Sequence, residues 1–283
     1  MQSISTIGLD IAKSVFQVHG VDAAGQVAIR RQLKRRFVLS FFEKLPPCLV
    51  GIEACASSHY WSRELQALGH TVRLMPPAYV KPYVKRQKND TTDAEAICEG
   101  VTRPNMQFVP TKTVEQQSGL MLHRARHLFI RQQTAVINSI RAYLAEFGIV
   151  APVGRRGVEQ LLEVVADTAD RRLPEVARAC LAALGSQLRV LKAHILEFDR
   201  RIIAWHRSSA TSKRLDVIPG VGPALATALV ASVAKAFRSG RDFSAWVGPC
   251  RSRIRAGARI SLAVSANKVI AICAACSRLA RSR

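Results

Sequence analysis

The first third of the chain alternates short β-forming runs with turn residues, and this order limits the folds that it can adopt. Three runs rich in Ile, Val and other β-forming residues cover residues 4–10, 14–20 and 26–32. The segment Asp22-Ala-Ala-Gly25 between the last two runs has the composition of a hairpin turn. The sequence therefore predicts three successive antiparallel strands.

A strand, a helix and a further strand follow these runs. After a short helix over Val38–Leu45, the sequence predicts a strand over Cys48–Ala54, a helix over Ser58–Leu68 and a strand over Thr71–Met75. Antiparallel strands that lead into such a unit describe a mixed sheet covered by helices. We therefore expect an α/β domain of the ribonuclease H-like class over residues 1–112.

Residues 113–210 are predicted to form a helical region. Helical spacing runs from Val114 to Phe147, and the chain resumes as helix after a Pro and Gly break at 152–157. Apolar residues in the later helix follow alternating steps of three and four, the a/d pattern of a coiled coil. These residues, called the heptad seam, are Leu181, Leu184, Leu188, Leu191, Ile195, Phe198 and Ile202. A hairpin that packs on its own chain is the alternative.

Residues 211–248 are predicted to form a mostly α C-terminal domain. The segment Ile218-Pro-Gly-Val-Gly222 resembles a helix-hairpin-helix, whose backbone N–H groups and following helix N-terminus can meet a phosphate. A plain corner between two helices is the alternative. The candidate nucleic-acid-binding residues at this turn are Lys213, Arg214, Gly220 and Gly222.

The charge of the chain points to a nucleic-acid partner. It has 42 Lys and Arg against 20 Asp and Glu, which gives a formal net charge of +22. Such an excess goes far beyond what solubility requires and favours DNA or RNA as the partner, with a generic basic surface as the alternative. No run of 18 apolar residues is present, which argues against a membrane partner. Seven cysteines at irregular spacing are typical of a reduced, cytoplasmic protein.

Four carboxylates stand out against this basic background. Asp10 and Glu53 each end an apolar strand, where an isolated buried carboxylate would be costly without a cation or strong donors. Asp90 and Asp93 are three residues apart and share one helix face. Four oxygen ligands of this kind suit one or two Mg²⁺ ions, which polarise a phosphodiester and activate a nucleophile. Alternatively, Asp90 and Asp93 only populate a helix N-terminal turn, where acids are favourable.

A basic segment comes directly before the acidic pair. Lys85, Arg86 and Lys88 are predicted to hold nucleic-acid phosphates near the metal, with Tyr79 and Tyr83 available to stack on bases. A solvated charged face is the alternative.

Several of these segments resemble the DEDD transposases of bacterial insertion sequences, the family typified by insertion sequence one-ten. The matching stretches occur in family order and at family-like spacing, and they span most of the chain up to Gly248. They are Ile7-Gly-Leu-Asp-Ile-Ala-Lys-Ser14, Gly51-Ile-Glu-Ala54, Lys88-Asn-Asp-Thr-Thr-Asp-Ala-Glu-Ala-Ile97, Val217-Ile-Pro-Gly-Val-Gly-Pro223 and Phe243-Ser-Ala-Trp-Val-Gly248.

The resemblance implies that the domain over residues 1–112 is RuvC-like. It also implies a recombinase that acts on element ends and target DNA under the guidance of a structured bridge RNA. It implies that Asp10, Glu53, Asp90 and Asp93 bind Mg²⁺ and that a serine of the C-terminal domain is the nucleophile. It also implies a central coiled coil used in assembly, which matches the heptad seam and predicts a homo-oligomer. A bacterial protein associated with the nucleoid is the expected setting.

Residues 249–283 depart from the family pattern, which continues at this point toward a Ser-Ser-Gly-Gly-Lys segment with the nucleophilic serine. This tail has eight Lys and Arg and no acid. Permitted codons for Ser252–Ala280, read after the first two bases are skipped, spell Q-N-S-S-G-G-K-D-K-L-G-S-I-S-K-Q-G-D-R-Y-L-R-S-L-F. We therefore interpret the tail as the product of a reading-frame change near Pro249 that removes the nucleophile.

The sequence thus predicts a DNA transposase that is inactive in this copy because its C-terminal serine is lost. Two alternatives stay open. The four carboxylates alone could support a nuclease similar to a Holliday-junction resolvase, in which water attacks the phosphodiester. The chain could also be a remnant without enzymatic activity that binds nucleic acid through its charge.

Overall fold

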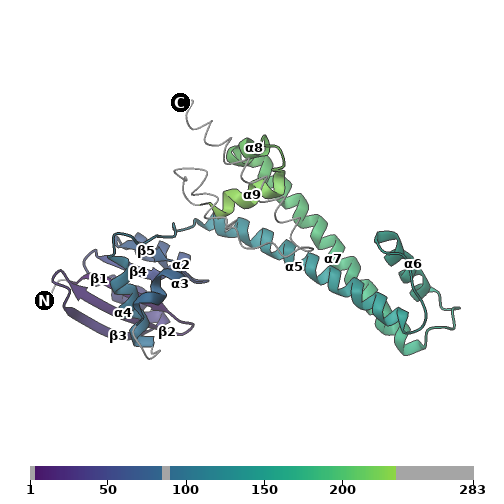
Figure 1. Ribbon diagram of the computed structural model, residues 1–283, viewed down its shortest axis with the longest axis horizontal. Coiled ribbons are helices and arrows are strands. Elements are labelled where there is room, and N and C mark those ends of the chain that lie inside the picture. Colours follow the sequence, from purple (N-terminus) through teal and green to yellow (C-terminus); the bar gives the residue numbers. More distant parts are fainter. Residues whose placement is uncertain (1–3, 85–89, 234–283) are drawn as a thin grey trace. The chain divides into compact units, whose positions relative to one another are not determined.

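The computed structural model describes residues 4–84 and 90–233, apart from the side chains of residues 90, 91 and 155 (Figure 1). The chain forms two compact units, of which the first covers Met1–Thr113 and the second begins at Val114. Lys85, Arg86, Lys88 and the tail 249–283 lie outside the described residues.

The first unit is built on a five-stranded sheet in the order β3-β2-β1-β4-β5 (Figure 1). The strands are β1 (Ile4–Ile11), β2 (Val15–Asp22), β3 (Val27–Lys34), β4 (Leu49–Glu53) and β5 (Thr71–Met75). β2 pairs antiparallel with β1 and with β3, whereas β4 pairs parallel with β1 and with β5. The predicted mixed sheet is therefore confirmed.

The predicted turn between β2 and β3 is held by a side chain. The Asp22 carboxylate accepts hydrogen bonds from the backbone N–H groups of Ala24 and Gln26, both at 2.9 Å. Gly25 has φ 78°, a conformation that glycine adopts without steric cost. The Asp-Ala-Ala-Gly composition thus carries the information that the turn requires.

Helices cover the two faces of this sheet and enclose two apolar cores. The helices of the unit are η1 (Arg35–Phe37), α1 (Val38–Phe42), α2 (Ser58–Ala67), α3 (Pro77–Val80), η2 (Lys81–Tyr83) and α4 (Asp90–Val101). Leu9, Phe16 and Ile52 belong to one core, together with Trp61 of α2. On the other face, Ile97 and Val101 of α4 form a separate core with residues that include Met75 and Met106.

Two glycines let α4 lie directly on the sheet. Gly8 of β1 and Gly51 of β4 are paired in the parallel ladder. A Cβ atom on Gly8 would lie 2.0 Å from the carbonyl oxygen of Ala94 and 2.5 Å from the backbone nitrogen of Cys98. A Cβ atom on Gly51 would lie 2.8 Å from the Cβ of Val101. No other residue fits at position 8 unless the helix moves away from the sheet.

The second unit is helical, and its two long helices, α5 (Val114–Ala145) and α7 (Glu175–Ser208), run side by side (Figure 1). The other helices are α6 (Arg155–Ala166), α8 (Ala210–Asp216) and α9 (Pro223–Ser232). Phe129 of α5 stacks on His194 and contacts Phe198 edge to face, both with ring centroids 5.3 Å apart. Arg126 forms an ion pair with Asp199 nearby. These contacts fix the pairing of α5 with α7.

The heptad seam of α7 packs against its own chain. Leu181, Leu188 and Leu191 are buried in one core with residues of α5 that include Ile140 and Leu144. For these three leucines, the structure shows a helical hairpin within one chain, which was the alternative to a coiled coil between chains. The spacing of the leucines is the same in both cases. An assembly between chains through the coiled coil stays a prediction, and it requires apolar side chains outside this core.

Two arginines hold the loops at the ends of α6. Arg141 donates to the carbonyl oxygens of Ala151, Pro152 and Gly154 at 2.8–3.2 Å. Arg178 donates to the carbonyls of four residues between 164 and 170. Part of the basic excess of the chain therefore serves its own backbone and is not available for a ligand.

Among the described residues, no helix is both long and apolar enough to cross a membrane. The cysteines in this part of the chain, Cys48, Cys55, Cys98 and Cys180, are free thiols. Burial raises the pKa of the Cys48 and Cys98 thiols to about 11, so neither is a reactive thiolate at neutral pH.

We predict that Gly8→Ala destabilises the first unit by about 1–3 kcal/mol or more, because its Cβ would overlap the backbone of α4. Gly100→Ala, within α4 itself, is the matched control. Its Cβ would lie 3.2 Å from the flexible end of Met106, and loss of a helical glycine offsets that crowding by about 0.5–1 kcal/mol. Urea unfolding measures the free energy of unfolding of both variants, and equal values would contradict the close packing of α4 on the sheet.

We predict that Leu188→Ala costs about 2–5 kcal/mol of unfolding free energy, since Leu188 is fully buried between α5 and α7. Val176→Ala on the same helix should cost less than about 0.5 kcal/mol because Val176 is 77% exposed. Because the contact lies within one chain, the loss should not depend on protein concentration. A loss that disappears at high concentration would instead assign the seam to a contact between chains.

Candidate active site

Asp10 and Glu53 lie at neighbouring positions of two parallel strands. Leu9 of β1 pairs with Ile52 of β4, and each carboxylate is the next residue of its strand. Parallel neighbours lie about 4.8 Å apart, and residues at one level of the ladder point to the same face. Asp10 and Glu53 therefore extend from the face that carries Gly8 and Gly51, which is the face covered by α4.

Asp93 comes to these two carboxylates from the first turn of α4. Burial raises the pKa of the Glu53 carboxyl, and the charges of Asp10 and Asp93 raise this pKa further. This effect requires both carboxylates to lie close enough to repel a charge on Glu53. Asp90 is the first residue of α4, one helical turn before Asp93, but its side chain is outside the described part. The structure thus brings three of the four predicted carboxylates together.

The three carboxylates have the charge of a metal site but are spread more widely than a closed coordination shell. Among the described side chains, no three His, Cys, Asp or Glu residues are close enough together to form a coordination cluster. Asp10 and Asp93 nevertheless both repel a charge on Glu53, and oxygen ligands with surplus negative charge are what Mg²⁺ binds. The residues present therefore fit a divalent cation in charge and in ligand type.

Sequence reasoning missed the two glycines that position the site. Each lies two residues before a carboxylate, in Gly8-Leu-Asp10 and in Gly51-Ile-Glu53. Side chains alternate between faces along a strand, so each glycine lies on the same face as its carboxylate. The repeated spacing was a signal that a helix approaches this face closely.

The predicted stacking residues differ in their surroundings. Tyr79 is 49% exposed, as a side chain available for stacking would be. Tyr83 is partly buried against the core beneath α4, and the guanidinium of Arg103 lies 5.9 Å from its ring centroid. Tyr83 therefore takes part in packing the first unit.

The predicted phosphate-binding turn joins α8 to α9. Gly220 has φ 87°, and the N–H of Val221 donates to the carbonyl of Ile218 at 2.9 Å, so the turn is tight. Gly222 is the N-cap of α9, and a Cβ atom on it would meet no atom of the described residues within 4 Å. The candidate binding residues Lys213, Arg214, Gly220 and Gly222 lie on or directly beside this turn. The structure shows two helices joined by a tight turn here, and the helix-hairpin-helix and phosphate binding stay predictions.

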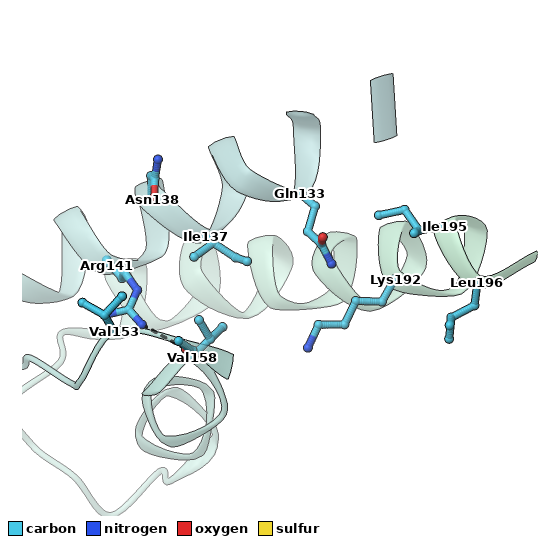
Figure 2. A pocket seen from close by; sticks show the side chains of 10 residues that line it. Gln133, Ile137, Asn138, Arg141, Val153, Val158, Lys192, Ile195 and Leu196 are labelled. Carbon is cyan, nitrogen blue, oxygen red and sulfur yellow. Dashed lines mark hydrogen bonds between the residues drawn. The ribbon is translucent and has the colours of Figure 1, made fainter. Parts of the chain in front are cut away.

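A groove of about 680 Å³ lies in the second unit, between α5, α7 and the segment that leads into α6 (Figure 2). Its lining includes Gln133, Ile137, Val158, Lys192 and Leu196. Arg141 also lines it, but this side chain is used to hold the loop before α6. The groove contains none of the predicted site residues.

His59, for which no role was predicted, anchors the end of the first unit. Its Nδ1 accepts a hydrogen bond from the backbone N–H of Lys112 at 3.2 Å. Burial and the charges of Lys112 and Arg63 lower its pKa to about 4. The imidazole is therefore neutral at physiological pH, as an acceptor must be.

Two family models match the chain. One, a DEDD transposase model of the IS110 type, matches residues 7–149. The other, described as transposase IS116/IS110/IS902 family, matches residues 212–268. The first match contains all four predicted carboxylates, and the second contains the turn between α8 and α9.

Curated relatives carry the same kind of name. A probable family 20 transposase of Pseudomonas aeruginosa is 50% identical over 249 residues, which are 87% of this chain and 74% of that protein. A putative transposase of Sinorhizobium fredii, y4pF/y4sB, is 48% identical over 88% of this chain, which spans 64% of that relative. The transposase for insertion sequence element IS1328 of Yersinia enterocolitica is 34% identical over 93% of this chain and 78% of its own length. With these matches, the chain belongs to the IS110/IS116/IS902 family of insertion-sequence transposases.

Proposed function

We propose that this chain carries the metal site of a transposase that cleaves and joins DNA strands, with Asp10, Glu53, Asp90 and Asp93 as the ligands of one or two Mg²⁺ ions. The convergence of Asp10, Glu53 and Asp93 from β1, β4 and α4 carries the proposal. A divalent ion bound there would polarise a phosphodiester and lower the pKa of an attacking hydroxyl.

The fold supports this role because the ligands lie on rigid elements. Asp10 and Glu53 are fixed by the ladder between β1 and β4, and Asp93 is fixed by a helix that touches the backbone of the sheet. Such an arrangement holds carboxylates at a set distance even though they repel one another. An Asp or Glu on a loop would move away from its neighbours.

Charge supports nucleic acid as the substrate and as the guide. We infer that the turn with Lys213, Arg214, Gly220 and Gly222 meets phosphates of DNA or of a structured RNA, and that Lys85, Arg86 and Lys88 do so beside the carboxylates. The net charge of +22 provides the long-range attraction. RNA guidance is proposed from the family resemblance.

We also propose a homo-oligomer formed through the outer faces of the long helices. Met121 and Leu128 of α5 and Val190 and Leu196 of α7 are 43–70% exposed. These side chains lie outside the core between α5 and α7 and would be covered by a second copy. Light scattering at micromolar concentration tests this assembly, and a monomeric mass would contradict it.

The tail decides whether this copy is active. We infer a reading-frame change near Pro249, which would remove the serine nucleophile. The second family match, however, ends at residue 268, 19 residues beyond position 249. A frame change near Pro249 means that residues 250–268 no longer follow the family sequence, whereas the family match includes these residues. An experiment can decide between the two.

We predict that recombination with Mg²⁺, the flanking noncoding RNA and donor and target DNA requires the family-like tail. The existing chain and a version with the shifted frame restored are compared in one assay. Product only with the restored tail supports the transposase proposal and the frame change. Product with both chains would contradict the loss of the nucleophile. Cleavage by the existing chain that releases ends without a protein adduct would instead favour the resolvase-like alternative.

Asp10→Asn in the restored chain is the control for the carboxylates. It should abolish recombination, because the change removes a ligand for the metal. It should leave nucleic-acid binding intact, because no Lys or Arg that contacts phosphate is changed. If the restored wild type binds nucleic acid but neither cleaves nor joins it, the non-enzymatic alternative is favoured.

We predict that Glu53→Gln stabilises the metal-free protein increasingly as pH rises. The pKa of Glu53 is raised in the folded state, so its contribution to stability is present below the ordinary carboxyl pKa and lost as pH rises through the raised value. Gln keeps the shape without the charge. Urea unfolding at a series of pH values measures the difference, and Glu43→Gln, at an exposed position, is the matched control.

Mg²⁺ should reverse this order at neutral pH. A metal at 100 times its dissociation constant stabilises the wild type by about 2.7 kcal/mol and should stabilise Glu53→Gln far less. Equal stabilisation of the wild type and Glu53→Gln by Mg²⁺ would contradict the ligand role of Glu53.

A further inference from the structure

A row of polar residues crosses the sheet from the carboxylates to its edge strand. Asp10 of β1 pairs with Gln17 of β2, and Gln17 pairs with Gln32 of β3. With strands about 4.8 Å apart, Gln32 lies roughly 10 Å from Asp10 on the same face of the sheet. β3 is the outermost strand on this side, so the row ends at solvent.

Two side chains of β3 on this face, Arg30 and Lys34, are basic. Arg30 reaches Glu95 of α4 at 3.5 Å, which places the even-numbered residues of β3 on the α4 face. Lys34 follows Arg30 by four residues and is exposed. It therefore lies on the same face as Asp10, at an estimated Cα separation of about 12 Å.

The end of β3 is fixed beside the end of β1. The N–H of Arg35 donates to the carbonyl of Ser14 at 2.9 Å, which ties η1 to the turn between β1 and β2. Lys13 lies in this turn and is exposed. Since β1, β3 and β4 run in the same direction, Lys13 and Lys34 lie at the edge of the sheet where the two strand carboxylates lie.

An exposed aromatic ring lies in η1, three residues after Lys34. Phe37 is 47% exposed, and the guanidinium of Arg36 lies 4.6 Å from its ring centroid. Asp22 is the sole acid between residues 11 and 42. Its carboxylate holds the turn between β2 and β3, at the other end of these strands. We call the four residues Lys13, Lys34, Arg36 and Phe37 the β3 rim.

We propose that the β3 rim binds a single-stranded segment of nucleic acid that leads to the carboxylates. Lysine and arginine attract the phosphodiester backbone, and an exposed aromatic ring stacks on an unpaired base. A paired base in a duplex does not present its face to Phe37. The inference rests on the proposed function, because it assigns the path of the strand on which the carboxylates act.

Single-residue variants of the full chain test the rim by fluorescence anisotropy with short single-stranded DNA, single-stranded RNA and duplex DNA across a salt series. Lys34→Gln should lower the slope of log affinity against log salt by about 0.7 for a single strand. Phe37→Leu should weaken single-strand binding about five- to one-hundred-fold with an unchanged slope. It should leave duplex binding unaffected.

Arg31→Gln is the matched control for Lys34→Gln. It removes one charge from the same strand, but Arg31 pairs with Val18, whose side chain belongs to the core on the other face. Tyr143→Leu, at a position 49% exposed on α5, is the control for Phe37→Leu. Equal losses in Lys34→Gln and Arg31→Gln, or no loss in Phe37→Leu, would overturn the proposal.

Crosslinking adds a readout that does not depend on affinity. A single strand substituted with 5-iodouracil should crosslink to Phe37 under ultraviolet light, and mass spectrometry of the peptide would identify the residue. The anisotropy measurements also compare single-stranded RNA with single-stranded DNA, and the one that binds more tightly is the strand that the rim holds. If the rim variants behave as expected but the tail-restored protein performs no cleavage, the rim stands and the proposed function fails. If the tail-restored protein cleaves but the rim variants bind as the wild type does, the proposed function stands and the rim fails.

Discussion

The parallel register between β1 and β4 is the constraint on which the candidate site depends. Backbone hydrogen bonds along this ladder place Gly8 opposite Gly51 and bring Asp10 beside Glu53. The glycines leave room for α4 to touch the backbone of the sheet, and α4 carries Asp93 to the same place. The repulsion of a charge on Glu53 by Asp10 and Asp93 is therefore imposed by hydrogen bonds and packing elsewhere in the unit.

Local patterns in the sequence were sufficient to predict the strands and most helices. The run 26–32 became β3 (Val27–Lys34), and the helix predicted over Ser58–Leu68 became α2 (Ser58–Ala67). The heptad seam was also visible, but its partner was not. Buried Leu188 obeys the same spacing whether the helix opposite belongs to the same chain or to another. Sequence spacing describes one surface, whereas the choice of partner depends on the whole fold.

The β3 rim could not be predicted because it depends on pairing across three strands. Lys34 shares a face with Asp10 only through the registers of β1 with β2 and of β2 with β3. The second register contains a shift between Gly20 and Val21. A shift of one residue transfers every later side chain to the other face. Alternation along a strand puts Arg31 and Lys34 on opposite faces, but the ladder alone shows which of them shares a face with Asp10.

The two glycines have a consequence for how a gene of this kind decays. Any missense change in a glycine codon adds at least a Cβ atom, and at position 8 that atom has no space. Substitutions at most buried positions are graded, because a smaller or similar side chain is tolerated in part. Gly8 has no conservative replacement, so any missense change in its codon disturbs the packing of α4 on the sheet. The target for inactivation is thus larger than the set of residues that would touch metal or DNA.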